Sequence, residues 1–238
     1  MPNQRALAVV LSLAAAAPAQ TVDLHVVRVA PRGDVVVVYS KDFDTCAHLL
    51  TPSLQILHSS NVFCTRASNV AGVFPGTTFN ANLVVGNPVH LCHGNNYNLC
   101  SPLVTVTAGA TLSADRWSLS LQRGGTQAFT LDAGSASAGR GYLLLGSASG
   151  TAGFTFRGLN VPLTPDGYFA FTLTSPNTFP LTASLGNLDA AGQAAASLTL
   201  PAGLSPALIG VVLHHAFVEL APAGPVRVSN AWPLTLGA

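Results

Sequence analysis

The chain has 238 residues, of which only 8% are charged, and its formal net charge at pH 7 is +1. Ordinary globular domains carry about 25% charged residues, so most of this surface must consist of uncharged polar side chains. A composition this neutral offers no electrostatic attraction for nucleic acid or an anionic membrane. Near-zero net charge favours self-association, so we expect partners among other copies of the chain or cell-surface components.

Residues 1–19 have the three parts of a secretory signal peptide. A start that carries Arg5 is followed by the apolar run ALAVVLSLAAAA and by small residues that fit a cleavage site after Ala19. That run is shorter than the stretch of about 20 apolar residues that a membrane-spanning helix needs. We therefore expect a secreted or cell-surface protein without a membrane-spanning segment in its mature chain.

Residues 20–108 are expected to form a small disulfide-bearing β-module. The β-branched runs VDLHVVRVA and DVVVVYS flank the turn residues 31–33, which predicts a strand, a turn and a second strand. The run LVTVT predicts a further short strand near the end of this region. All four cysteines of the chain lie here. An even number of cysteines in an exported protein indicates disulfides.

Residues 109–238 contain no cysteine and are expected to form an antiparallel, immunoglobulin-like or similar β-sandwich. Short apolar runs recur between turn signals, as is typical of sandwiches. Alternation predicts strands at 117–121 and at 169–174, the latter after a Pro-Asp-Gly turn. The segment GQAAASLTL is also predicted as a strand. The last two runs, LIGVVLHHAFVEL and VRVSNAWPLTL, predict an antiparallel hairpin.

This region resembles the C-terminal domain of secreted bacterial proteins that have no known activity. The similar motifs are LSLQRGGTQAFTLDAG, GYLLLGSASG, LDAAGQAAASLTLPAG, LHHAFVEL and VSNAWPLTL. The motifs VFCTR and LCHGNNYNLCS resemble those of an exported module without an assigned role. The resemblance implies an exported all-β protein and no particular chemistry.

The segment LCHGNNYNLC, residues 91–100, carries the densest group of chemically active side chains. Covalent haem needs C-x-x-C-H and structural zinc prefers closely spaced cysteine pairs, and the spacing here fits neither pattern. A nucleophilic cysteine needs a free thiol. We therefore expect a disulfide. Three pairings are possible, and the short separations favour Cys92–Cys100 with Cys46–Cys64.

The tip of the resulting loop is a candidate ligand-binding site. Its asparagines and glycine tolerate the turn geometry that a short loop requires. Polar disulfide loops are more often simply solvated, and we expect the tip to face solvent. The candidate residues are His93, Asn95, Asn96 and Tyr97.

Two other pairs of residues carry side chains that could bind a metal ion. His214 and His215 lie in one predicted strand, where adjacent side chains point to opposite faces, so they are not expected to chelate one ion. Asp42 and Asp44 have oxygen ligands suited to Ca²⁺, but no further acidic residue lies nearby in the sequence. We expect a solvated turn at the aspartates and predict no metal or cofactor.

The function favoured by these observations is non-enzymatic: a structural, adhesive or ligand-binding protein of the cell surface or extracellular space. A secreted hydrolase is the main alternative, with a site around Asp23, His25, His48 and His93. A carbohydrate-binding module is the third. It would use an aromatic platform formed by Trp117, Trp232, Tyr142 and Tyr168. We expect Trp117 and Trp232 to be core anchors instead.

Overall fold

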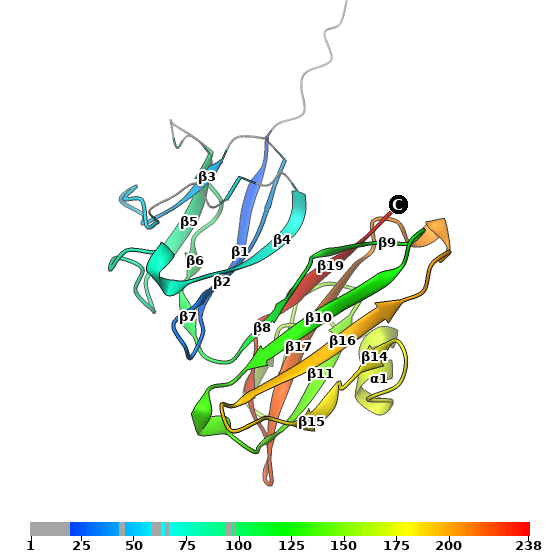
Figure 1. The fold of residues 1–238 in the computed structure, drawn as a ribbon. Coiled ribbons are helices and arrows are strands. Elements are labelled where there is room, and N and C mark those ends of the chain that lie inside the picture. The colour runs from blue at the N-terminus through cyan, green and yellow to red at the C-terminus, as the bar shows by residue number, and fades with distance from the viewer. Residues whose placement is uncertain (1–19, 43–45, 59–62, 65–66, 94–96, 98) are drawn as a thin grey trace, which may run out of the picture.

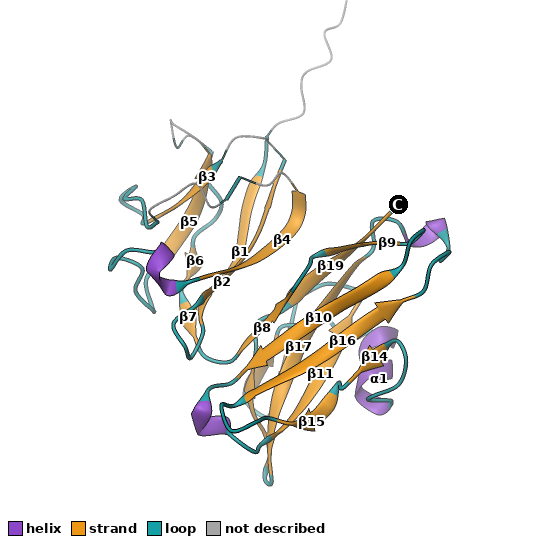
Figure 2. Cartoon of the chain, in the orientation of Figure 1, coloured by secondary structure: helices purple, strands orange, loops and turns teal. Residues whose placement is uncertain are grey.

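The computed structural model describes residues 20–238 except 43–45, 59–62, 65–66, 94–96 and 98. Strands dominate these residues, as Figure 2 shows, so the predicted all-β class is confirmed. The helical elements are α1 (Gly167–Thr174) and the 3-10 turns η1 (Gly76–Thr78), η2 (Ser135–Ser137) and η3 (Pro206–Leu208). Within this described part, no helix is long and apolar enough to cross a membrane. The predicted signal peptide lies outside it.

The N-terminal unit consists of two sheets. The larger one has the strand order β4-β2-β1-β7, with β1 (Val22–Val29), β2 (Val35–Lys41), β4 (Ala67–Phe74) and β7 (Thr107–Ala108). The smaller one has the order β3-β5-β6, with β3 (Ala47–Leu50), β5 (Pro88–His93) and β6 (Val104–Thr105). The two predicted first strands are confirmed, because β1 and β2 pair antiparallel across residues 30–34.

Strand β2 explains the run of four valines in the sequence. Val35, Val37 and Tyr39 face the core between the two N-terminal sheets. Val36 and Val38 point the other way, into a cluster of buried residues shared with the C-terminal unit. A strand that is covered on both faces needs apolar residues at every position rather than at alternate ones.

The C-terminal unit has two sheets that enclose one large core. The first sheet has the order β14-β16-β10-β8 and the second β15-β11-β17-β19-β9, with β18 also paired to β17. Strands of the first are β8 (Thr111–Ala114), β10 (Gly125–Asp132), β14 (Leu181–Thr182) and β16 (Gln193–Leu200). Strands of the second are β9 (Ser118–Ser120), β11 (Gly141–Ser147), β15 (Leu185–Asn187), β17 (Val212–Ala221), β18 (Gly224–Val228) and β19 (Trp232–Gly237). A separate hairpin pairs β12 (Phe154–Phe156) with β13 (Leu159–Val161).

Several sequence predictions for this unit are confirmed and two need a correction. GQAAASLTL contains β16, and the last two apolar runs pair antiparallel as β17 with β18 and β19. The sheets are not purely antiparallel, however, because β9 runs parallel to β19 and, in the N-terminal unit, β7 runs parallel to β1.

The predicted strand at 169–174 is wrong, since these residues belong to helix α1. The side chain of Asp166 accepts a hydrogen bond from the backbone N–H of Phe169 at 2.7 Å, which is the geometry of a helix N-cap. The Oγ1 of Thr172, fully buried, accepts from the backbone N–H of Gly146 at 3.0 Å. A cap at the first turn and a buried anchor on β11 therefore override the alternating pattern.

The two units meet along a shared apolar surface. The sheets divide the chain between β7 and β8, as Figure 1 shows, and no sheet of the described residues crosses that point. Val36, Val38 and Ala71 nevertheless belong to the same buried cluster as Leu112 and Trp232 of the C-terminal unit. The two units are therefore held together by side-chain packing in addition to the connecting chain.

Candidate functional site

Two disulfides lie in the N-terminal unit, and one of them closes the loop of residues 91–100. Cys46 is bonded to Cys64 and Cys92 to Cys100, which is the pairing that the short separations favoured. His90 lies beside the second bridge, and its ring nitrogen and the two sulfurs are within 4.8 Å of one another. Metal ligation by cysteine requires the thiolate, and both sulfurs are in a disulfide. The two cysteines therefore form a disulfide cross-link and do not serve as metal ligands.

The loop tip itself is only partly described. Asn95 and Asn96 lie outside the described residues, while His93 ends β5 opposite Ala47 of β3. Tyr97 differs from the expectation that it faces solvent, because its ring is half-buried. The ring packs edge-on against His48 at a centroid distance of 5.9 Å.

His48 in turn lies parallel to the ring of His58, with centroids 5.3 Å apart. Burial lowers the pKa of His48. Tyr97 therefore belongs to a packed aromatic group at the edge of the N-terminal unit.

The two adjacent histidines of β17 face opposite sides of the sheet, as the alternation predicts. His215 is completely buried, with its Nε2 2.9 Å from the Tyr168 hydroxyl and its ring 5.0 Å from that of Phe129. Desolvation lowers the pKa of His215 to about 3. His214 lies on the other face, where burial and the nearby His25 lower its pKa to about 4. The pair cannot chelate one ion.

His214 faces a cleft of about 540 Å³ between the two units. The N-terminal unit contributes one wall through β1 and the segment before β8. The C-terminal unit contributes the other through β13, β17 and the segment between β18 and β19. The side chains that offer hydrogen bonds include His25, Arg28, Thr105, Thr107, Thr151, Asn160 and His214. No carboxylate lies among the described residues that line this cleft.

A β-bulge in β1 lies at His25, which lines the cleft. The register between β1 and β2 shifts between Leu24 and Val26, so the extra residue is His25. The bulge places Val26 and Arg28 on the same outward face as His25, while Val27 faces the N-terminal core. His25 is exposed at the mouth of the cleft, and its Nε2 lies 3.1 Å from the Ser40 hydroxyl on β2. Partial desolvation lowers the pKa of His25, against a smaller opposing effect from the charge of Asp23.

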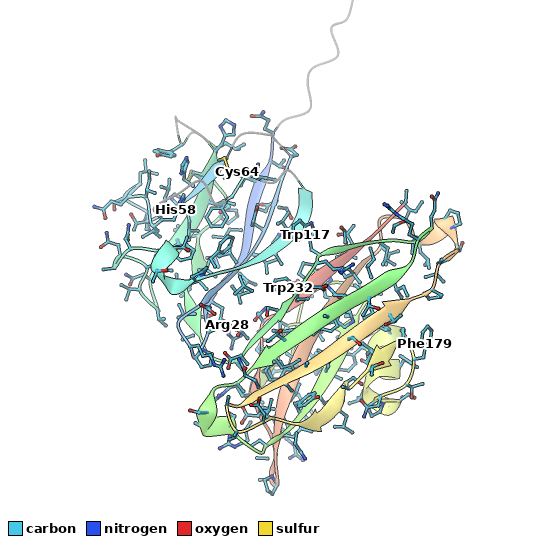
Figure 3. All side chains as sticks on the ribbon, viewed as in Figure 1. Arg28, His58, Cys64, Trp117, Phe179 and Trp232 are labelled. Carbon is cyan, nitrogen blue, oxygen red and sulfur yellow. A yellow bond between two sulfur atoms is a disulfide. The ribbon has the colours of Figure 1, made fainter. Side chains whose placement is uncertain are left out.

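Arg28 is the one charged residue of the described cleft wall. Its Nη2 donates to the backbone carbonyl of Val228 at 3.0 Å and so connects the two units. Burial, followed by the nearby Arg227, lowers the pKa of Arg28, but a guanidinium remains protonated in proteins. Figure 3 shows Arg28 at the end of the N-terminal unit that lies next to the C-terminal one. The cleft therefore holds a fixed positive charge without a carboxylate partner among the described residues.

The four residues of the hydrolase hypothesis do not come together. Asp23 and His25 lie on β1 and face away from the N-terminal core. His48 lies on β3 and His93 on β5, in the other sheet. His93 pairs with the core-facing Ala47, whereas His48 pairs with Cys92 on the opposite face of this sheet. The structure therefore does not bring the four residues together.

The aromatic residues considered for sugar binding and the aspartates considered for Ca²⁺ binding do not form binding sites among the described residues. Trp232 and Tyr142 are buried, Trp117 packs against the N-terminal core, and Tyr168 contacts His215. These four form no exposed aromatic row. The carboxylate of Asp42 accepts from the backbone N–H of Thr21 at 2.7 Å, while Asp44 lies outside the described residues.

No protein-family model matches the chain, and no curated protein matches it either. The resemblance to secreted bacterial proteins therefore stays a prediction. Arg28, Ser40 and Asn160 are among the cleft or cleft-adjacent residues that the sequence did not single out. Arg28 has a visible sequence signal, because it is a charged residue between the apolar Val27 and Val29.

Proposed function

We propose that the chain is an exported, non-enzymatic binding protein, and that the cleft between its two units receives a small polar ligand with a carboxylate group. The observation that carries this proposal is the guanidinium of Arg28, which lines the cleft where no described carboxylate neutralises it. Guanidinium–carboxylate hydrogen bonds are strong and directional. The two disulfides agree with an extracellular location.

The histidines of the cleft suit binding better than acid–base catalysis. His25 and His214 both have lowered pKa values, so they are mainly neutral near pH 7. A neutral imidazole offers one hydrogen-bond donor and one acceptor. Together with the threonines and Asn160, the two rings provide polar contacts without adding charge to the site.

We also propose that the C-terminal unit is immunoglobulin-like. The sheet order β8-β10-β16-β14 corresponds to A-B-E-D, and β11-β17-β19 corresponds to C-F-G, which is the constant-type arrangement. The unit differs from antibody domains because it has no disulfide between its sheets. Such domains commonly mediate recognition, but the fold alone does not specify a ligand, so the functional argument depends on the cleft.

The test is a titration of the disulfide-bonded mature chain with citrate, galacturonate and galactose, followed by two-dimensional NMR of the backbone amides. We expect citrate or galacturonate, but not galactose, to shift amides of β1, β13 and β17. R28Q should abolish these shifts, whereas R123Q, which removes an exposed arginine from a turn away from the cleft, should preserve them. Equal shifts in R28Q and the parent protein would reject the proposal.

One contact favours a second candidate function, a serine hydrolase. The hydrogen-bond distance between His25 and Ser40 is 3.1 Å, and Asp23 pairs with Ser40 across β1 and β2. A catalytic triad also needs a carboxylate that orients the histidine, and no hydrogen bond joins Asp23 to His25 among the described residues. Labelling by a fluorophosphonate that S40A eliminates would establish the hydrolase. Absence of labelling in the folded parent protein would exclude it.

A further inference from the structure

A second cavity, of about 330 Å³, lies on the outer face of the sheet that contains β11 and β17. The hairpin β12–β13 and helix α1 cover this face without filling it. One wall consists of Leu143, Leu145, Val218 and Leu220, which point away from the main core of the sandwich. The cavity is separate from the cleft, whose residues face the N-terminal unit.

The lining of this cavity is wholly apolar. All of its described lining residues are aliphatic or aromatic side chains or proline, and no polar atom is exposed within it. A buried water needs two to four polar partners, so this space is poorly suited to ordered water. Phe154 and Phe169 pack edge to face at 5.4 Å on the side formed by the hairpin and the helix.

The mouth of the cavity is also apolar. Phe156 and Leu173 line the cavity and are 51% and 47% exposed. Exposed large apolar side chains around an apolar cavity are typical of a binding site and not of a finished core. An alkyl chain that entered between them would gain burial along its whole length.

A single positive charge is fixed beside this mouth. Arg157 forms the β12–β13 turn with Gly158, and its guanidinium lies 5.8 Å above the ring of Phe156. Its Nη1 donates to the backbone carbonyl of Ala223 at 3.1 Å. A Cβ at Gly224 would lie 2.5 Å from that Nη1, so glycine is needed there for the arginine to take this position. No ion pair involves Arg157 among the described residues.

We propose that this cavity binds the alkyl chain of a free medium-chain fatty acid, with its carboxylate next to Arg157. The apolar lining selects the chain and the adjacent guanidinium selects the charge of the head group. A volume of about 330 Å³ is at the lower end of the usual range of about 300–1,000 Å³ for ligand pockets. One alkyl chain fits this space better than a lipid with two. This site is independent of the carboxylate site proposed in the cleft.

Calorimetric titration of the disulfide-bonded mature chain with hexanoate, octanoate and decanoate tests the chain-length requirement. Each added methylene is expected to tighten binding about fourfold, until the cavity is full. Decanol should bind more weakly than decanoate, because it has no charge to pair with the guanidinium. Equal affinities for all three acids, or no binding of decanoate, would overturn the proposal.

Two variants test the location. R157Q should weaken decanoate binding and leave decanol binding unchanged. L173E places a negative charge at the exposed mouth and should abolish decanoate binding. Its matched control is L208E, which changes another partly exposed leucine, 38% accessible, on the distant η3 turn. Decanoate binding by L173E that equals binding by L208E, or by R157Q that equals the parent, would contradict the assignment. Far-ultraviolet circular dichroism confirms that each variant is folded.

Discussion

Lowering the pH from 7 to 5 is expected to destabilise the protein by about 2 kcal/mol through His215 alone. Its imidazole is fully buried, with its Nε2 2.9 Å from the hydroxyl of Tyr168. Desolvation, followed by the charge of His214, lowers the pKa of His215 to about 3. The unfolded chain, with a histidine pKa of about 6.5, takes up the proton first. The stability from neutral burial is therefore complete only above about pH 6.5 and is lost as the pH falls.

The magnitude follows from the difference between the two pKa values. At pH 5 the unfolded chain is almost fully protonated at this position and the folded chain is not, which costs about 2 kcal/mol relative to pH 7. By pH 3 the loss reaches about 4 kcal/mol, because the folded chain begins to bind the proton only there. His214, whose pKa is lowered to about 4, changes stability in the same direction and adds to the total.

Urea unfolding at pH 7 and pH 5, followed by the fluorescence of buried Trp232, measures this effect. H215Q should reduce the difference in unfolding free energy between the two pH values by about 2 kcal/mol. Y168F is the control, because it removes the hydroxyl but keeps the histidine. It should lower stability by about 1 kcal/mol at both pH values. An H215Q protein that retains the full pH difference would refute the burial of a neutral His215.

Further substitutions test three interactions, namely the ion pair between Arg140 and Glu219, the cap of α1 and the Cys92–Cys100 bridge. R140M should destabilise the protein by about 2–3 kcal/mol in urea unfolding, because the Nη1 of Arg140 donates at 2.6 Å to the fully buried Glu219. The double variant R140M/E219M should lose less stability than the sum of the losses in R140M and E219M. D166A should cost about 1–2 kcal/mol by thermal unfolding, since this carboxylate caps α1; an unchanged melting temperature would contradict that cap. Replacing Cys92 and Cys100 by alanine should cost about 2–3 kcal/mol, and equal stabilities would show that the bridge is dispensable.

The N-terminal strands could be predicted because their signals are local. Residues 22–29 and 35–41 are rich in valine, and a Pro-Arg-Gly turn separates them. The disulfide pairing followed from short sequence separations. The strand prediction for residues 169–174 failed because the preceding Pro-Asp-Gly residues serve equally well as a strand-connecting turn and as a helix N-cap. Only contacts with β11, which lies about twenty residues earlier in the chain, decide between these two structures.

The candidate site was much less predictable than the fold. His25 and His214 come from opposite ends of the chain, and only the packing of the two units brings them to one cleft. The outward position of Arg28 also depends on a bulge in β1, for which the sequence gives no clear signal. The apolar cavity was missed for a related reason. Leu143 and Val218 are typical core residues in sequence, and nothing local indicates that their side of the sheet is incompletely covered.

Strand β13 forms a common wall between the two proposed sites. Asn160 lines the cleft, while its neighbours Leu159 and Val161 line the apolar cavity, because successive side chains of a strand point to opposite faces. Arg28 and Arg157 thus act on different sides of one strand and share no described contact. R28Q should leave decanoate binding unchanged, and R157Q should leave the citrate-induced shifts of β1 unchanged. Loss of both binding properties in either folded variant would show that the two sites are coupled.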